Sequence, residues 1–296
     1  MSANSPNLFI LGAPKCGTTT LAAWLAQHPQ VYFSPEKEPR HFYAPYGELI
    51  SRESYEALFE QAPADAKYLG EASVWYLFGG TAVPKILEYN PEARFIVCLR
   101  NPVKMAPSLH AQMLYTGKEL ISNFEDAWKA SDQRYAGEHI GIFGFDHQGD
   151  PACMAYKQAC MLGQQVEILL QQIDKERVLF VLLEDLSANP EETWDQIQDF
   201  LGLAHFAGFP LRAHNQAKRR KFLGLQRFTL FAENLKRRLG IKKRFGILAI
   251  FNRRNVAKEK YPPPPKELQK SMQQTFRDDI LKLSNLVNRN LSNWLS

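Results

Sequence analysis

The sequence lacks any long run of hydrophobic residues. Although 45% of its 296 residues are hydrophobic, it contains no stretch of about 18 consecutive apolar residues. The first residues, Met-Ser-Ala-Asn-Ser-Pro, also lack the charged start and the apolar centre of a secretion signal. We therefore expect no membrane-spanning helix and a cytoplasmic location. The chain is long enough to bury an ample core in one large α/β domain or two small ones.

Cysteine is scarce, and its spacing argues against a metal site. The four cysteines form no Cys-x-x-Cys pair, which is the pattern typical of zinc sites and redox-active dithiols. Reduced thiols and no bound metal are therefore expected. The four residues are Cys16, Cys98, Cys153 and Cys160.

The glycine-rich turn near the N-terminus has no lysine directly after its second glycine. An apolar run over residues 8–12 leads into Gly12-Ala-Pro-Lys-Cys-Gly-Thr-Thr, and a helical pattern follows. The phosphate loop of proteins that hydrolyse ATP or GTP carries a lysine directly after its second glycine. Here Thr18 follows Gly17, and the lysine of the turn, Lys15, lies between the two glycines. The turn thus predicts a phosphate site, but not that of a nucleotide hydrolase.

A strand that enters such a turn before a helix directs backbone N–H groups and the positive end of the helix at one point. We expect the backbone amides of residues 14–19 to bind one phosphate, with the hydroxyls of Thr18 and Thr19 as further donors. Lys15 could stabilise the charge that develops on an oxygen of that phosphate when a bond to it breaks. The residues assigned to this site are Pro14, Lys15, Cys16, Gly17, Thr18, Thr19 and Thr20.

A second candidate phosphate site follows the apolar run at residues 94–99. Arg100 comes directly after this run, and Ser108 lies about two helical turns further on. The carboxyl ends of parallel strands are where such sheets bind ligands. A guanidinium and a hydroxyl that converge there could hold a second phosphate. The alternative is an arginine that forms a salt bridge to a helix.

Strand-like runs and helical patterns alternate along most of the chain. This alternation predicts an α/β, P-loop-like fold of three layers, in which helices flank a central, mostly parallel sheet of about five strands. The expected strands are residues 8–12, 30–33, 68–70, 94–99 and 177–183. The expected helices are residues 18–28, 52–61, 80–89, 102–115, 123–132, 152–174, 190–201 and 265–290. Asn189 is the expected N-cap of the helix at 190–201.

The chain shows no internal repeat, and we expect a single domain over residues 1–296. Within it, residues 1–6 are expected to form a flexible N-terminus, residues 212–260 a separate basic segment and residues 265–296 a C-terminal helix.

The turn with Lys15 and the Arg100–Ser108 pair resemble the 5′- and 3′-phosphate sites of sulfotransferases that use PAPS (3′-phosphoadenosine 5′-phosphosulfate). Further segments resemble the bacterial and heparan-sulfate-type branch of that family. They are Pro35-Glu-Lys-Glu-Pro-Arg-His-Phe-Tyr43, Gly70-Glu-Ala-Ser-x-x-Tyr76, Leu183-Glu-Asp-Leu186 with Asn189-Pro190, Asn215 with the basic residues Arg219, Arg220 and Lys221, and the final helix at 280–294. The resemblance covers most of residues 7–294.

This resemblance implies a single in-line step that moves a sulfuryl group from PAPS to an acceptor hydroxyl or, less often, an amine. The product would be adenosine 3′,5′-bisphosphate (PAP), and no metal is implied. Lys15 would stabilise the leaving phosphate, and Glu38 occupies the place of the glutamate base of the heparan-type branch. One extra residue, Arg40 or His41, separates Glu38 from the aromatic pair that follows. The base is therefore left open between Glu38, His41 and another residue.

Positive charge is concentrated late in the chain. Residues 212–260 contain 16 of the 36 lysines and arginines, but only two of the 31 acidic residues, which suggests an anionic partner. By resemblance, Arg219, Arg220 and Lys221 would close over the 3′-phosphate of the nucleotide. Alternatively, residues 222–251 form a basic amphipathic hairpin that contacts an anionic membrane weakly, or the segment is an ordinary solvated surface. No nucleic-acid-binding motif is recognised, so no such partner is expected.

The leading interpretation is a PAPS-dependent sulfotransferase, of bacterial type, that acts on a small-molecule or glycan acceptor. The expected acceptor loops are rich in aromatic residues, which suit a sugar ring or an apolar metabolite. The acceptor group is therefore expected to be a hydroxyl of a glycan, a lipid or a secondary metabolite. A P-loop kinase and a non-catalytic nucleotide-binding protein are the alternatives. Glu71 and Ser73 either line the acceptor side, or Glu71 forms a structural ion pair. The oligomeric state is not readable from the sequence.

Overall fold

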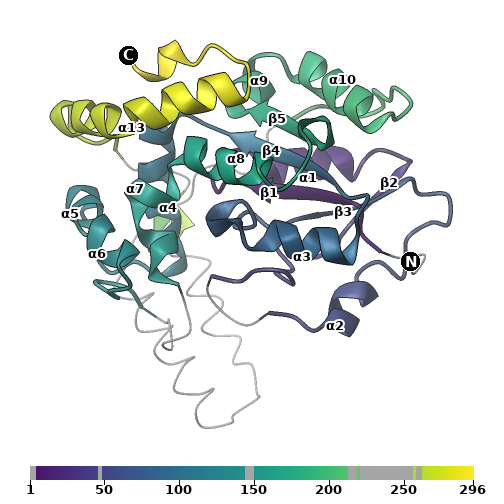
Figure 1. The fold of residues 1–296 in the computed structure, drawn as a ribbon, viewed down its shortest axis with the longest axis horizontal. Helices are drawn as coiled ribbons and strands as arrows, with labels where there is room; N and C mark the ends of the chain where they lie inside the picture. Colours follow the sequence, from purple (N-terminus) through teal and green to yellow (C-terminus); the bar gives the residue numbers. More distant parts are fainter. Residues whose placement is uncertain (1–4, 46–48, 144–149, 213–218, 221–255, 258–261) are drawn as a thin grey trace, which may run out of the picture.

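A five-stranded parallel sheet forms the centre of the molecule. The computed structural model describes residues 5–45, 49–143, 150–212, 219–220, 256–257 and 262–296. The strand order is β2-β3-β1-β4-β5, and every neighbouring pair is parallel (Figure 1). The strands are β1 (Leu8–Gly12), β2 (Val31–Phe33), β3 (Tyr68–Ala72), β4 (Arg94–Leu99) and β5 (Val178–Leu182). The predicted fold class is confirmed, and each expected strand lies within two residues of its observed bounds.

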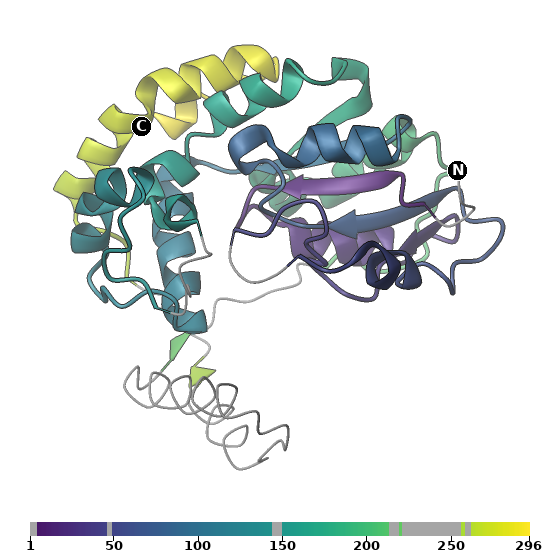
Figure 2. The same cartoon turned by 60° about the horizontal axis from the view of Figure 1, so that its bottom comes forward.

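Helices cover both faces of the sheet, as the unbroken apolar character of its central strands requires. Helices α3 (Ala82–Tyr89) and α8 (Leu162–Leu170) lie on one face, and α1 (Thr18–Leu25) and α10 (Pro190–Leu201) lie on the other (Figures 1 and 2). Every residue of β1 is buried. Trp24 of α1 packs edge-on against Trp194 of α10, with ring centroids 6.4 Å apart.

A helical lobe, formed by α4 to α7, lies at the carboxyl edge of the sheet. Its longest member, α4, follows β4 directly, and α13 crosses both α8 and the lobe (Figure 2). The helices of the lobe and of α13 are α4 (Pro102–Thr116), α5 (Phe124–Lys129), α6 (Ser131–Tyr135), α7 (Tyr156–Ala159) and α13 (Lys266–Leu286). The other elements within the described residues are α2 (Arg52–Ala57), α9 (Leu183–Ala188) and the antiparallel pair β6 (Arg219–Arg220) and β7 (Val256–Ala257). Described 3₁₀ turns lie at Phe78–Gly80, Pro151–Met154, Lys175–Arg177 and Ser292–Trp294.

The single helix expected over residues 152–174 is wrong. The structure has a 3₁₀ turn, then α7, then α8 in its place. Helix α8 starts afresh because the Asp279 carboxylate on α13 accepts hydrogen bonds from the N–H groups of Gly163 and Gln164, both at 2.8 Å. A Cβ on Gly163 would lie 2.3 Å from the Asp279 carbonyl oxygen. This helix terminus is capped from a distant part of the chain, so no local signal marks it.

Three smaller expectations also differ. Residues 123–132 form two short helices, α5 and α6, and residues 183–188, where no helix is expected from the sequence, form α9. Asn189 precedes α10 as expected, but its side chain makes no capping hydrogen bond. Instead, the Thr193 hydroxyl donates to the Asn189 carbonyl at 2.8 Å. Within the described ranges, none of the helices has the length and apolarity needed to cross a membrane.

A fully buried ion pair holds the helical lobe together. Glu119, just after α4, accepts two hydrogen bonds from the Arg134 guanidinium of α6, at 2.8 and 3.0 Å. The Tyr156 hydroxyl donates to the same carboxylate at 2.7 Å, and Arg134 also donates to the carbonyl oxygens of Ile140 and Met154. Both side chains are completely buried. The segments that meet at this pair are therefore fixed relative to α4.

Replacing Arg134 with methionine is expected to destabilise the protein by about 3–5 kcal/mol, because it leaves the Glu119 carboxylate buried without its counter-charge. Urea unfolding of the variant measures this loss. Arg52→Met is the matched control, since Arg52 forms an exposed pair with Glu56 and such pairs contribute little. Equal unfolding midpoints for the two variants would contradict the prediction.

Candidate functional site

The turn between β1 and α1 is shaped by two glycines. At Gly12, with φ of 138°, a Cβ would lie 2.3 Å from the Val74 carbonyl oxygen. At Gly17, with φ of 95°, a Cβ would lie 3.0 Å from the side chains of Leu183 and Leu186. Both positions require glycine because of close approach and left-handed backbone. The chain can therefore reverse tightly here and begin α1 at the carboxyl edge of the sheet.

The turn offers fewer amide donors than the expected residues 14–19. Pro14 has no N–H, and the N–H of Cys16 donates to the Ala13 carbonyl at 3.3 Å. Among the described residues, no acceptor is found for the N–H groups of Lys15, Gly17 and Thr18. These three groups surround the N-terminus of α1, whose dipole is positive there. The turn retains the properties of an anion site, with a smaller set of donors.

Cys16 shapes the turn from within the core. Its side chain is completely buried, and its thiol lies 3.7 Å from the sulfur of Met105. Burial raises the pKa of this thiol well above its usual range. Thr18 and Thr20 are also buried, and the Thr20 N–H donates to the Gly17 carbonyl at 2.9 Å. We conclude that the Cys16 side chain packs and does not face a ligand.

Lys15 lies at the centre of a cluster of positive charge. Its ammonium donates to Oε1 of Gln112 on α4 at 3.2 Å, and Arg100 donates to its carbonyl at 3.1 Å. Burial lowers the pKa of Lys15, and the charges of Arg100 and Lys37 lower it further. The structure thus brings together the lysine and arginine of the two predicted phosphate sites. An anion bound between Lys15 and Arg100 would offset the repulsion between their positive charges.

Ser108 lies on α4, four residues before Gln112, so the two side chains share one face of the helix. It is half-buried. The α4 face that contacts Lys15 therefore also carries the predicted hydroxyl of the second phosphate site.

A cleft of about 250 Å³ opens beside Lys15, between the sheet and α4. Lys37 and Glu38 form one side of it, and Lys118 lies beyond the end of α4. Apolar side chains complete the walls. The lining residues are Pro14, Lys15, Gly17, Thr18, Lys37, Glu38, Val74, Trp75, Leu109, Gln112, Met113, Thr116 and Lys118. A site with apolar walls and a few converging charged groups is typical of small-molecule pockets.

Glu38 presents a carboxylate to this cleft from an unusual backbone. Its φ is 61°, and Arg40 follows with φ of 57°. Lys15 has φ of 66°. For residues with a Cβ this conformation costs about 1 kcal/mol or more. The Glu38 N–H donates to the Ala72 carbonyl at 3.0 Å, and its Oε1 lies 3.4 Å from Nζ of Lys37. Two of the predicted catalytic residues, Lys15 and Glu38, thus line one cleft from strained positions.

His41, the other candidate base, is packed outside the set of residues that line the cleft. Its ring stacks on Tyr55 at 4.6 Å and meets Phe42 edge-on at 4.8 Å. Its Nδ1 lies 2.9 Å from the Ile50 carbonyl. The position of His41 therefore favours Glu38 as the base.

Glu71 fits neither role expected for it, since it is completely buried and is held by hydroxyls. Ser73 donates to its Oε2 at 2.8 Å and Tyr55 to its Oε1 at 3.3 Å, and the nearby Tyr76 hydroxyl also lowers the pKa of Glu71. It neither lines the cleft nor pairs with a described cation. Burial raises the pKa of Glu71 to about 7.

This raised pKa predicts a pH-dependent stability. Glu71 binds its proton more tightly in the folded protein than in the unfolded chain, where its pKa is about 4.5. Its contribution to stability is therefore greatest below pH 4.5 and falls as the pH rises through 7, by about 3 kcal/mol in all. In urea unfolding across this range, the free energy of unfolding of the wild type is expected to fall relative to that of Glu71→Gln. Parallel curves for the two proteins would contradict this prediction.

Lys118 is a residue of the site that the sequence does not predict. It lies in the cleft, and burial lowers its pKa to about 7, while the charge of Glu38 acts in the opposite direction. Its loop is fixed by the Glu119–Arg134 pair described above. In the sequence, Lys118 is marked only by its place directly after a glycine. In the structure, that glycine, Gly117, ends α4 with φ of 78°. A buried lysine in that position is set by tertiary packing, which the local sequence does not encode.

The basic segment, residues 212–260, lies mostly outside the described residues. Arg219 and Arg220 form β6, which pairs with β7, and their side chains are not described; Lys221 lies outside the described ranges. Their expected role over the 3′-phosphate stays a prediction. The expected membrane contact through residues 222–251 also falls on residues outside the described ranges.

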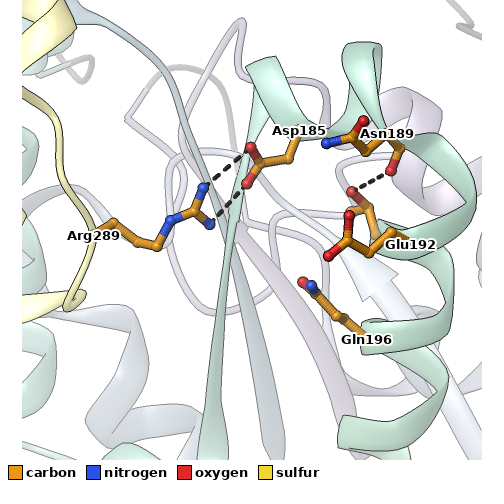
Figure 3. A pocket seen from close by; sticks show the side chains of 6 residues that line it. Asp185, Asn189, Glu192, Gln196 and Arg289 are labelled. Carbon is orange, nitrogen blue, oxygen red and sulfur yellow. Dashed lines mark hydrogen bonds and ion pairs between the residues drawn. The ribbon is translucent and has the colours of Figure 1, made fainter.

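A second, polar depression of about 180 Å³ lies between α9, α10 and the segment after α13 (Figure 3). The Arg289 guanidinium donates two hydrogen bonds to Asp185, at 2.8 and 3.2 Å. This bidentate pair ties the C-terminal segment to α9. No cluster of three or more His, Cys, Asp or Glu side chains suited to a metal occurs in the described part of the chain.

Comparison with known proteins shows a match to one family over most of the chain. Residues 5–219 match the family described as "Sulfotransferase domain". Human carbohydrate sulfotransferase 15 is 24% identical over 248 residues, which covers 67% of this chain and 44% of that protein. Human heparan sulfate glucosamine 3-O-sulfotransferase 6 is 27% identical over 202 residues, covering 67% and 52%. The chain thus spans about half the length of these relatives, or less.

Among solved structures, a sulfotransferase from Alicyclobacillus acidocaldarius superposes on nearly the whole chain. The match covers 98% of this chain and 99% of that one, with a TM-score of 0.70 and 22% identity. A likeness at this identity concerns the fold, including the parallel sheet and the helices around it.

Proposed function

This chain belongs to the sulfotransferase domain family, and we propose that it moves a sulfuryl group from PAPS to the hydroxyl of an acceptor. The observation that carries the proposal is the cation cluster at the N-terminus of α1. Lys15 and Arg100 are in contact there, beside three backbone N–H groups for which the described residues provide no acceptor. These are the groups that phosphates prefer in proteins.

The residues present fit a doubly phosphorylated nucleotide. The turn with Lys15, Gly17 and Thr18 would hold the phosphate that carries the sulfuryl group, and Arg100 with Ser108 would hold the other. PAPS supplies the activated sulfuryl group. Arg219, Arg220 and Lys221 are proposed to close over the second phosphate.

The chemistry of the step divides between two side chains. As the bond from sulfur to the phosphate oxygen breaks, negative charge grows on that oxygen, and the Lys15 ammonium stabilises it. As the acceptor oxygen bonds to sulfur, its proton passes to the Glu38 carboxylate. Gln112 orients the Lys15 ammonium before the reaction, since its Oε1 accepts a hydrogen bond from it. The products would be the sulfated acceptor and PAP, and the proton leaves Glu38 to solvent.

The acceptor is proposed to be a small molecule or a glycan. The apolar part of the cleft, with Val74, Trp75, Leu109 and Met113, suits the face of a sugar ring or an apolar metabolite. A screen of glycan, lipid and phenolic acceptors with ³⁵S-labelled PAPS identifies the class.

Calorimetric titration with PAP and with ATP–Mg²⁺ tests the donor assignment. We expect PAP to bind without magnesium and more tightly than ATP–Mg²⁺. A preference for ATP–Mg²⁺ would favour a kinase, which the threonine at position 18 disfavours because such loops need a lysine there. Binding of neither nucleotide would overturn the proposal.

A further inference from the structure

The segment that carries Glu38 is held by three hydrogen bonds from its own backbone. The N–H of Glu38 donates to the carbonyl of Ala72, at the end of β3, at 3.0 Å. The N–H of Arg40 donates to Oγ of Ser73 at 3.3 Å. The N–H of Phe42 donates to the Tyr76 hydroxyl at 3.2 Å. Two of the three acceptors are therefore side-chain hydroxyls from the turn after β3.

Both hydroxyls also face Glu71. Ser73 donates to Oε2 of Glu71 at 2.8 Å, and the Tyr76 hydroxyl is close enough to the same carboxylate to stabilise its charge and so lower the pKa of Glu71. Glu71, Ser73 and Tyr76 are all buried, with exposed fractions of 0%, 2% and 0%. The carboxylate thus lies behind the two hydroxyls, on the side away from the Glu38 segment.

The numbers of protons and lone pairs on these groups determine the direction of the hydrogen bonds between them. A hydroxyl has one proton to donate and two lone pairs, whereas an ionised carboxylate can only accept. When Ser73 and Tyr76 each give their proton to Glu71, their lone pairs are left for the N–H groups of Arg40 and Phe42. Without the carboxylate, each hydroxyl could turn its proton toward the Glu38 segment, where it would face another donor.

We propose that Glu71 is a positioning residue for Glu38. It orients the hydroxyls of Ser73 and Tyr76 so that they accept hydrogen bonds from the N–H groups of Arg40 and Phe42. These bonds fix the turn that presents the Glu38 carboxylate to the cleft. The turn needs such support because Glu38 and Arg40 both have left-handed backbone, with φ of 61° and 57°. The inference rests on the proposed function only where it gives Glu38 a role in transfer.

Tyr55 provides an internal control for this arrangement. Its hydroxyl donates to Oε1 of Glu71 at 3.3 Å, but the described contacts of that hydroxyl include no backbone group of the Glu38 segment. Tyr55→Phe therefore removes one donor from Glu71 and leaves both hydroxyls that face the segment. Its ring can still stack on His41.

Hydrogen exchange measures the turn directly and needs no substrate. At about pH 8, where the carboxylate form of Glu71 prevails because its pKa is about 7, the amides of residues 38–42 are expected to exchange about tenfold faster in Ser73→Ala, Tyr76→Phe and Glu71→Gln than in the wild type. Tyr55→Phe and a peptide over β4 should keep wild-type rates. Unchanged exchange in Ser73→Ala and Tyr76→Phe, or an equal increase in Tyr55→Phe, would overturn the proposal.

Activity separates positioning from general stability. With ³⁵S-labelled PAPS and the acceptor found by the screen, kcat is expected to fall about tenfold or more in Ser73→Ala and Tyr76→Phe, while KM for PAPS and Kd for PAP stay near wild type. A matching loss of PAP affinity would mean that the variants disturb the whole site and would contradict the proposal. If the wild type itself fails to transfer sulfuryl groups, the proposed function fails, and the exchange result still decides the role of Glu71.

Discussion

Turnover is expected to fall about 10²- to 10³-fold when Lys15 is replaced with alanine, the range for loss of one group that stabilises developing charge. The affinity for PAP should fall far less, because the ammonium acts mainly on charge that appears as the bond to sulfur breaks. In the proposed complex, the three backbone amides of the turn would still hold that phosphate, and Arg100 would still hold the other. The measurement is kcat with ³⁵S-labelled PAPS, together with calorimetric titration of PAP.

Lys104→Ala is the matched control, since Lys104 is an exposed lysine on α4 and its loss should leave kcat unchanged. Comparable turnover in the Lys15 variant and the wild type would show that another residue stabilises the leaving phosphate. A loss confined to PAP affinity would assign Lys15 to binding alone.

Glu38→Gln is expected to abolish measurable transfer, with a loss of at least about 10²- to 10⁴-fold, since glutamine cannot take the acceptor proton. PAP binding should stay near normal, because a carboxylate is not among the proposed donors to the two phosphates. The same labelled-PAPS assay and PAP titration measure both quantities. Glutamine keeps the shape of the side chain, so the backbone turn at this position is retained.

Glu36→Gln, two residues earlier and exposed, should behave like the wild type. Retained activity in the Glu38 variant would place the base elsewhere. His41→Ala is then the next variant, although the stacking of His41 on Tyr55 favours a structural role for it.

The sheet could be predicted from the sequence because its signals are local. Residues 94–99 form an unbroken apolar run, and β4 has those bounds. Likewise, the run at 8–12 ends in glycine and becomes β1. Once the strands are parallel, their carboxyl ends share one edge, so the meeting of Lys15 and Arg100 also followed from the sequence.

Three features that escaped prediction depend on contacts between residues that are apart in the sequence. The start of α8 is set by Asp279, more than a hundred residues away. The burial of Glu71 follows from the packing of Tyr55 and Tyr76 around it, and a glutamate in a strand pattern gives no sign of this. Lys118 lies in the cleft because the Glu119–Arg134 pair fixes the loop it begins.

The cap that Asp279 provides also bears on where an independently folding unit ends. The portion of the chain that matches the family stops at residue 219, yet α13 begins only at Lys266 and buries Met272, Phe276, Ile280 and Leu283. A fragment cut at the family boundary would lose the acceptor for the Gly163 and Gln164 amides and uncover the apolar side of α8. Any truncated version of the chain must therefore keep the last helix, either in place or supplied as a separate peptide.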